Sequence, residues 1–236
     1  MEKGPALQPR LRAIADLVPP GGVLADIGTD HGYIPVSLLL SGRIGGAIAS
    51  DIGALPLEHA RRTAREYGVK ERLEFRLGDG LSVLRPGEAD TIVIAGMGGD
   101  NIAAILSAAP WTREGALLLL QPMSKAEALR AFLPESGYAV QAECLAADKG
   151  VLYPILTVRG GEMPAAAPAQ AWGGFLLRED PLWGRYLSER ILRLRKAAAG
   201  LERAKDSALS ERRETFLSVV AALEAWKGEW QRANRI

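Results

Sequence analysis

A short apolar strand, a glycine turn and an apolar helix follow one another within residues 21–40. Residues 21–25 are typical of a turn entering a buried parallel strand, and Val36–Leu40 are typical of a helix. The run between them, Ala25–Pro35, reads A-D-I-G-T-D-H-G-Y-I-P. Glycine in such a turn lets the backbone approach a ligand, and the helix N-terminus offers unpaired N–H groups. The order strand, turn, helix therefore predicts an α/β fold with a nucleoside-like ligand.

The composition of the turn argues against a dinucleotide. The motif G-x-G-x-x-G needs three glycines, whereas this turn has Gly28 and Gly32 with Asp30 between them. Asp26 and Asp30 would also repel a pyrophosphate. An acidic turn suits a ligand with hydroxyl groups and a positive centre, which describes S-adenosylmethionine better than NAD. An ordinary tight turn without a ligand is the alternative for this segment taken alone.

Three later apolar segments also end in acidic residues or glycines. Residues 47–52 include Asp51, 25 positions after Asp26, near the spacing at which α/β folds place an acid on a ribose. Residues 73–77 lead into Gly78-Asp79-Gly80, which leaves room for an adenine ring and an acceptor for its amino group. Residues 91–95 open into Gly96-Met97-Gly98-Gly99, a loop small enough to lie against a flat target ring.

The remaining strands complete the fold prediction. Residues 117–122 form a fifth apolar segment, and residues 138–145 and 151–158 form a hairpin around Asp148-Lys149-Gly150. Parallel strands that alternate with helices and end in an antiparallel hairpin predict a doubly wound α/β fold. We expect a mostly parallel, seven-stranded Rossmann-like sheet of the kind found in S-adenosylmethionine-dependent methyltransferases.

Together these runs resemble the bacterial tRNA (adenine-22, N1)-methyltransferases. The resemblance extends over nearly the whole chain, and its most specific strings are D-I-G-T-D-H from Asp26 and I-A-G-M-G-G from Ile94. It implies methyl transfer from S-adenosyl-L-methionine to N1 of an adenine in tRNA, at position 22. Adenine N1 carries an in-plane lone pair, so positioning the base matters more than a strong general base.

The resemblance also implies which residues form the site. Asp26, Gly28 and His31 border the methionine part of the cofactor, Asp51 and Ile52 the ribose, and Asp79 and Gly80 the adenine. The full cofactor-binding set is Asp26, Gly28, Thr29, Asp30, His31, Gly32, Asp51, Ile52, Asp79, Gly80, Ala95, Gly96 and Met97. The predicted substrate-binding residues are Arg10, Gly98, Gly99, Arg190, Arg193 and Lys196. No metal is predicted.

His31 and Tyr33 follow the first turn and are the candidate catalytic residues. We expect them to orient the target base or to handle its proton. The alternative for the pair is a histidine at a helix entry and a packed tyrosine.

The composition changes at Gly160–Pro168, a stretch of small residues and prolines typical of a linker. The sequence predicts a methyltransferase domain over residues 1–160 and a linker with a helical coiled-coil domain over residues 161–236. Apolar residues recur at helical spacing in two stripes, which predicts two antiparallel helices joined near Ser207–Ser210. The stripes are Leu187, Ile191, Leu194, Ala198, Leu201 and Ala208, then Phe216, Val219, Val220, Leu223, Trp226 and Trp230.

The two parts differ in charge. Residues 181–236 hold 12 Lys and Arg against 7 Asp and Glu, a net charge of +5, whereas residues 1–180 hold 17 against 21, a net charge of −4. Two interpretations of the basic helices remain open, a phosphate-binding surface and an ordinary solvated face. The cations concerned are Arg190, Arg193, Arg195, Lys196, Arg203 and Lys205. Trp226 and Trp230 are predicted to pack rather than to stack on bases.

Composition favours a cytoplasmic enzyme, because no apolar run approaches membrane-spanning length and no signal peptide is indicated. The tRNA partner is what the family resemblance implies. A monomer or weak dimer is expected. Two other functions remain open: a methyltransferase of a small molecule or protein, and a non-catalytic RNA-binding protein on a methyltransferase scaffold.

Overall fold

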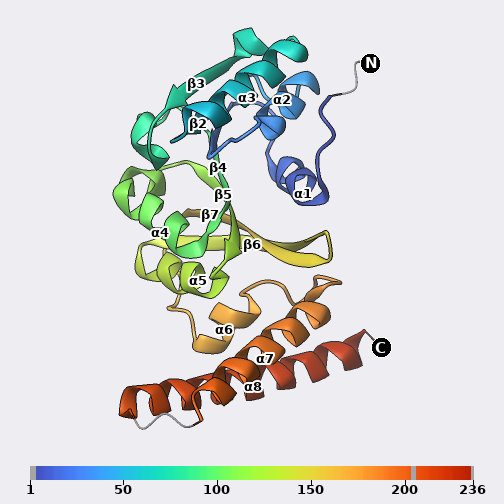
Figure 1. Cartoon of the computed structure of the whole chain (residues 1–236), viewed down its shortest axis with the longest axis vertical. Helices are drawn as coiled ribbons and strands as arrows, with labels where there is room; N and C mark the ends of the chain where they lie inside the picture. Colours follow the sequence, from blue (N-terminus) through green and yellow to red (C-terminus); the bar gives the residue numbers. More distant parts are fainter. Residues whose placement is uncertain (1–3, 203–205, 235–236) are drawn as a thin grey trace.

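The computed structural model describes residues 4–202 and 206–234, and its centre is a seven-stranded sheet (Figure 1). The strands lie in the order β3-β2-β1-β4-β5-β7-β6. Strands β1 to β5 are parallel, whereas β7 runs antiparallel to both β5 and β6. The predicted doubly wound, mostly parallel sheet is therefore confirmed. The strands are β1 (Val23–Ile27), β2 (Gly46–Asp51), β3 (Leu73–Leu77), β4 (Thr91–Gly98), β5 (Leu117–Ser124), β6 (Tyr138–Asp148) and β7 (Val151–Gly160).

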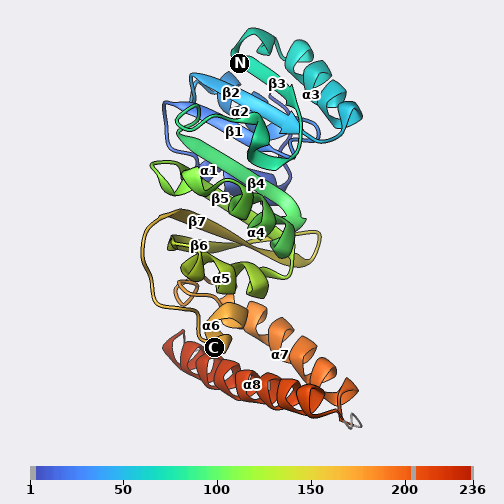
Figure 2. The same ribbon diagram turned by 90° about the vertical axis from the view of Figure 1, so that its left-hand side faces the viewer.

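Helices cover both faces of the sheet. Figure 2 shows α4 and α5 in front of it, with α1 and α2 behind, and each layer buries its own apolar cluster against the strands. One layer holds α1 (Pro9–Leu17), α2 (Tyr33–Leu40) and α3 (Ala54–Glu66), and the other holds α4 (Gly99–Ala108) and α5 (Ala126–Glu135). Short 3-10 turns join some elements: η1 (Lys70–Arg72), η2 (Gly80–Val83) and η3 (Pro110–Arg113). Strands covered on both faces read as continuous apolar runs, as in β5, where Leu117–Leu120 are all buried.

Several strands extend further than the sequence predicts. Strand β4 continues past Ala95 to Gly98, with a bulge around Gly96, so most of the predicted glycine loop is paired with β5. The bulge bends the strand end and changes the direction of its side chains. The hairpin turn is at Lys149-Gly150, as expected, but β6 and β7 both run further than predicted.

The C-terminal part consists of α6 (Pro168–Gly173), α7 (Trp183–Gly200) and α8 (Ser207–Ala233). Helices α7 and α8 pack along each other below the sheet in Figure 1 and bury the predicted stripes, with Trp226 and Trp230 half-buried in their shared core. The predicted junction near Ser207–Ser210 is wrong, because Asp206 caps α8 and Ser207 is already helical. Ala208 is exposed rather than part of the stripe. Arg203 and Lys205 lie outside the described residues.

A buried ion pair connects the sheet with these helices. Arg130 of α5 donates to Glu143 of β6 at 2.7 Å, and both side chains are fully buried. Arg130 also donates to the Ala171 carbonyl of α6 and to the Tyr186 hydroxyl of α7. Burial alone lowers the pKa of Arg130, but Glu143 and Tyr186 outweigh it, so the net shift is upward. Arg130 therefore keeps its positive charge inside the protein.

None of the helices in the described part of the chain has the length and apolarity needed to cross a membrane.

Candidate active site

The candidate site lies at the carboxyl ends of the parallel strands, where the strand order reverses between β1 and β4. Ligands of doubly wound sheets bind in the crevice at this point, because the connections on its two sides lead to opposite faces of the sheet. Figure 2 shows the parallel strands ending at one edge of the sheet. The turns after β1, β2, β3 and β4 carry the predicted cofactor residues, so the structure brings those segments together.

The turn after β1 places a buried carboxylate beside a glycine. Asp26 is 5% exposed and accepts a hydrogen bond of 2.6 Å from the Thr29 hydroxyl. Burial raises the pKa of Asp26 to about 6; the Thr29 hydrogen bond lowers it, and the charge of Asp51 raises it further. Gly28 has φ +74°, a conformation that favours glycine, and its N–H donates to the Ser50 carbonyl of β2.

Two hollows meet at Gly28. The larger, about 750 Å³, is lined by Asp51, Ile52, Asp79 and Gly80 as predicted, together with Met97 from the end of β4. The smaller, about 470 Å³, is lined by the predicted residues Arg10, Asp26, Thr29, Asp30, His31, Tyr33, Ala95 and Gly96. The Met97 methyl group lies where a Cβ on Gly28 would be, so the glycine makes room for Met97 at the point where the two hollows share a wall. Gly32 caps α2 beside the smaller hollow but does not line it.

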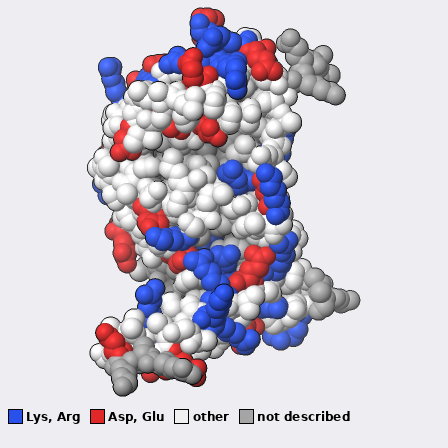
Figure 3. Space-filling model, in the orientation of Figure 1, with Lys and Arg blue, Asp and Glu red and all other residues white. Residues whose placement is uncertain are grey.

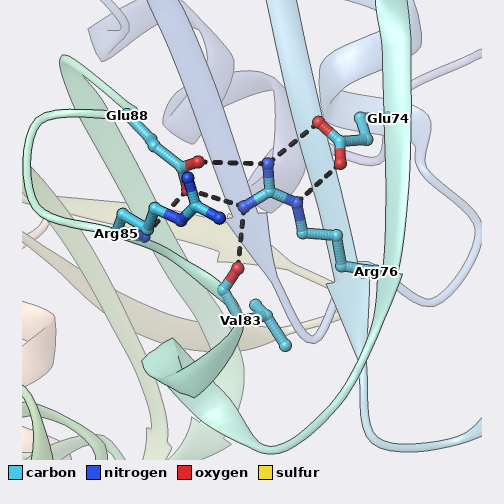
Figure 4. Close-up of polar contacts among 5 residues, drawn as sticks. All are labelled: Glu74, Arg76, Val83, Arg85 and Glu88. Atoms are coloured by element: carbon cyan, nitrogen blue, oxygen red, sulfur yellow. Dashed lines mark hydrogen bonds and ion pairs between the residues drawn. The ribbon is translucent and has the colours of Figure 1, made fainter.

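An arginine network holds the turn that carries Asp79 and Gly80. Arg76 of β3 donates to Glu74 at 2.8 Å, to Glu88 at 2.6 Å and to the Val83 carbonyl at 2.7 Å (Figure 4). Its hydrogen bonds lower the pKa of both Glu74 and Glu88. Because Val83 ends η2 and Glu88 lies further along the same loop, the guanidinium ties both back to β3. The wall of the larger hollow is thereby fixed.

Gln121 is a site residue that sequence reasoning missed. It is fully buried within β5, directly after the apolar run Leu117–Leu120, and its side-chain oxygen Oε1 accepts from Arg10 at 2.6 Å and from the Gly96 N–H at 3.2 Å. Gln121 thus positions Arg10 and the bulge of β4 together, while Arg10 also lies over the Tyr153 ring. A polar residue at the end of an apolar strand was the signal, the same one that identified Asp26 and Asp51.

His59 of α3 lies against the predicted site residue His31 but lines neither hollow. The His31 ring stacks on Tyr33 with ring centroids 5.1 Å apart and on His59 with centroids 4.9 Å apart. Asp30, His31 and His59 each place a possible metal-ligand atom within 4.8 Å of the others. The two imidazole planes differ by only 9°, whereas an ion shared by them would have to lie in the plane of each ring. We therefore interpret the cluster as an aromatic stack.

The predicted substrate residues are scattered. Gly98 ends β4 and is the N-cap residue of α4, whereas Gly99 is buried, and the Lys125 carbonyl lies where its Cβ would be. Close backbone packing therefore requires glycine at position 99, and its predicted contact with substrate stays a prediction. Arg190 lies over Tyr186, Arg193 over Trp172, and Lys196 is exposed on α7; these three line neither hollow.

The chemistry of the hollows is acidic. Asp26, Asp30, Asp51 and Asp79 line them, whereas Arg10 is the one Lys or Arg among the described lining residues. Carboxylates accept hydrogen bonds from ribose hydroxyls and attract a cationic centre, and they repel phosphates. The arrangement fits a sulfonium nucleoside and does not fit a dinucleotide.

Known proteins agree with this geometry. Residues 7–156 match the family model of a methyltransferase domain. A tRNA (adenine(22)-N(1))-methyltransferase of Bacillus subtilis is 38% identical over 184 residues, which cover 78% of this chain and 75% of the relative. The crystal structure of the B. subtilis m1A22 tRNA methyltransferase TrmK aligns with a TM-score of 0.85 and 28% identity, covering 94% of this chain and 99% of that one.

A second solved structure bears on the ligand. Sp1610 of Streptococcus pneumoniae, crystallised in complex with S-adenosyl-L-methionine, aligns with a TM-score of 0.79 and 30% identity. The alignment covers 91% of this chain and 100% of that one.

Proposed function

This chain belongs to the tRNA (adenine(22)-N(1))-methyltransferase family, and from that membership we propose that it methylates N1 of adenine 22 in tRNA. S-adenosylmethionine supplies the methyl group on a positively charged sulfur, and the in-plane lone pair of adenine N1 accepts it. The observation that carries the proposal is the pair of acidic hollows that meet at Gly28.

The larger hollow would hold the adenosine part of the cofactor. Asp51 at the end of β2 would accept from ribose hydroxyls, and Asp79 would accept from the adenine amino group. Asp26 would face the cationic methionine end from the smaller hollow. That end would then lie near Gly28, Met97 and the bulge of β4.

The smaller hollow would receive the target base. Its walls combine Arg10, held by Gln121, with the stacked rings of His31 and Tyr33. Holding the base in line with the methyl carbon supplies much of the catalysis in such a reaction, because no strong base is needed at N1. We assign His31 and Tyr33 this orienting role.

The target base must leave its base pair before reaction, which costs a few kcal/mol. Contacts between the basic helices and tRNA phosphates would offset this cost. We propose that residues 1–160 form the catalytic domain and residues 161–236 a tRNA-binding domain. We also propose that the enzyme acts in the cytoplasm as a monomer or weak dimer.

The decisive experiment incubates the protein with labelled S-adenosylmethionine and unmodified tRNA transcripts, then maps the label by mass spectrometry. We expect 1-methyladenosine at position 22 and no label in a transcript with guanosine there. Label at adenine N6, or no label in any transcript, would overturn the proposal. Isothermal titration separates a non-catalytic scaffold, which would bind tRNA but not S-adenosylmethionine.

The orienting role is tested separately. With saturating cofactor and tRNA, His31→Ala and Tyr33→Phe should each lower kcat at least tenfold, while cofactor affinity changes less. Wild-type turnover in both variants would remove the assignment.

A further inference from the structure

A second groove lies between the sheet domain and the helices, outside the two hollows. Its volume is about 560 Å³, within the range of roughly 300–1,000 Å³ typical of ligand sites. Half-buried Trp172 of α6 and Phe216 of α8 form its apolar floor, and Lys125, Arg193 and Arg212 add positive charge. Glu127 is the one acid among the described lining residues. We call this the Trp172 groove.

Aromatic rings and guanidinium groups are paired in this groove. Arg193 lies over the Trp172 ring, 5.5 Å from its centroid, and Arg212 lies over Phe216 at 5.4 Å. The two rings meet edge to face, with centroids 6.3 Å apart. Unpaired RNA bases stack on aromatic rings and on guanidinium planes, while cations hold the adjoining phosphates. One cavity therefore contains protein groups for both kinds of contact.

The groove begins beside the catalytic edge. Lys125 pairs with Asp100 in the first turn of α4, two residues after Gly98 at the end of β4. A Cβ on Gly98 would lie 3.5 Å from the Ser124 hydroxyl, the residue before Lys125. Figure 3 shows several Lys and Arg side chains, with acidic ones between them, on the lower half of this face, where α5 to α8 lie in Figure 1, and another group of both signs at its upper end. An RNA strand leaving the smaller hollow would therefore meet positive charge along this route.

We propose that the Trp172 groove binds an unpaired nucleotide of the tRNA substrate, near the extruded target. Its base lies against the Trp172 and Phe216 floor, and its phosphates are held by Lys125, Arg193 and Arg212. This rests on the proposed function and adds to it a subsite that would stabilise the opened RNA conformation. A continuous helix would not enter a cavity of this shape, so the subsite would select tRNA with an unpaired neighbour.

The test measures tRNA affinity and turnover for Phe216→Leu, Trp172→Leu and Arg212→Ala in the full-length chain. Loss of stacking should raise the KM for tRNA about tenfold for each aromatic variant, with kcat and the Kd for S-adenosylmethionine unchanged. Arg212→Ala should reduce the slope of log affinity against log salt by about 0.7–0.9, the value of one phosphate contact. Arg65→Ala, which removes an exposed arginine of α3 outside the C-terminal helices, is the matched control and should change neither.

The outcomes separate the two proposals. If the wild-type protein methylates tRNA but Phe216→Leu and Arg212→Ala bind tRNA normally, the groove is not an RNA subsite. If the wild-type protein methylates no tRNA, the proposed function fails first. Trp172→Leu and Phe216→Leu count only if their thermal unfolding matches the wild type, since both rings pack against the apolar cluster of α7 and α8; Arg212→Ala decides the question without them.

Discussion

Gly28 is the residue on which the geometry of the site most depends. It adopts φ +74°, and a Cβ there would meet the Met97 methyl group where the two hollows share a wall. Alanine would therefore cost about 1–2 kcal/mol of backbone strain and also displace the Met97 side chain toward the space of the cofactor.

Gly28→Ala should weaken S-adenosylmethionine binding at least tenfold, measured by titration calorimetry. Gly42→Ala is the matched control, because Gly42 has φ +68° with nothing within 4 Å of a Cβ. That variant should lose similar stability but keep cofactor affinity. Equal affinity for S-adenosylmethionine in Gly28→Ala and Gly42→Ala would contradict the prediction that cofactor binding needs the space of a missing Cβ at Gly28.

Asp26 makes stability and binding depend on pH in opposite directions. Its pKa in the folded protein is about 6, above the ordinary 3.8, so the folded state holds the proton more tightly. Stability of the ligand-free protein should therefore fall as the pH rises from about 4 to about 6, by at most roughly 3 kcal/mol. A cationic ligand favours the carboxylate, so affinity for S-adenosylmethionine should rise over the same range.

Calorimetry in two buffers of different ionisation enthalpy should detect a proton released on cofactor binding near pH 6. Asp26→Asn should remove that release, flatten the pH dependence of stability and weaken binding. Asp16→Asn, an exposed carboxylate on α1, should behave as wild type. Unchanged cofactor affinity in Asp26→Asn would contradict the placement of Asp26 at the cationic end.

At the scale of elements, β3 and η2 depend on Arg76. This residue is the common partner of Glu74, Glu88 and the Val83 carbonyl, and the turn it holds carries Asp79. Arg76→Ala should loosen that turn and raise the KM for S-adenosylmethionine roughly tenfold, a loss of about 1.4 kcal/mol, with a smaller effect on kcat. Arg65→Ala, whose exposed partner is Glu58 on α3, should leave both values unchanged. A tenfold fall in kcat with an unchanged KM for S-adenosylmethionine would contradict this role of Arg76.

For the molecule as a whole, the Arg130–Glu143 pair joins the sheet to the C-terminal helices. Glu143 also accepts from the backbone N–H groups of Phe175 and Leu176, which fixes the connection between α6 and α7. Deleting α6 to α8 would expose this pair and the apolar hairpin residues Leu145 and Leu152, so a truncated chain is not a fair test of tRNA binding.

Arg130→Met should destabilise the protein by about 3–5 kcal/mol, because it leaves a buried carboxylate without its partner. In a chain of this size that corresponds to a fall in Tm of about 6–20 °C by calorimetry. Arg195→Met removes an exposed pair with Glu224 and should cost less than about 1 kcal/mol. Similar losses of stability in Arg130→Met and Arg195→Met would contradict the expectation that a buried ion pair costs more to break than an exposed one.

The local pattern of the chain was enough to predict the sheet, the acidic turns and the class of cofactor. These features depend on only a few neighbouring residues, namely the periodicity of each strand and the glycines beside Asp26, Asp51 and Asp79. They are therefore visible in the linear sequence. Strand ends and the α7–α8 junction were less predictable, because pairing beyond Ala95 depends on β5 and on the bulge at Gly96.

Only the tertiary structure decided which distant residues complete the site. Arg10 and Gln121 are 111 positions apart, and nothing in their local spacing predicts their hydrogen bond. The same holds for His59 on His31, for Arg130 on Glu143 and for the Trp172 groove. The sequence by itself determined the class of ligand, because short-range sterics and charge select a turn. The partners that orient a substrate depend on how whole elements pack, and that packing is set by the entire core.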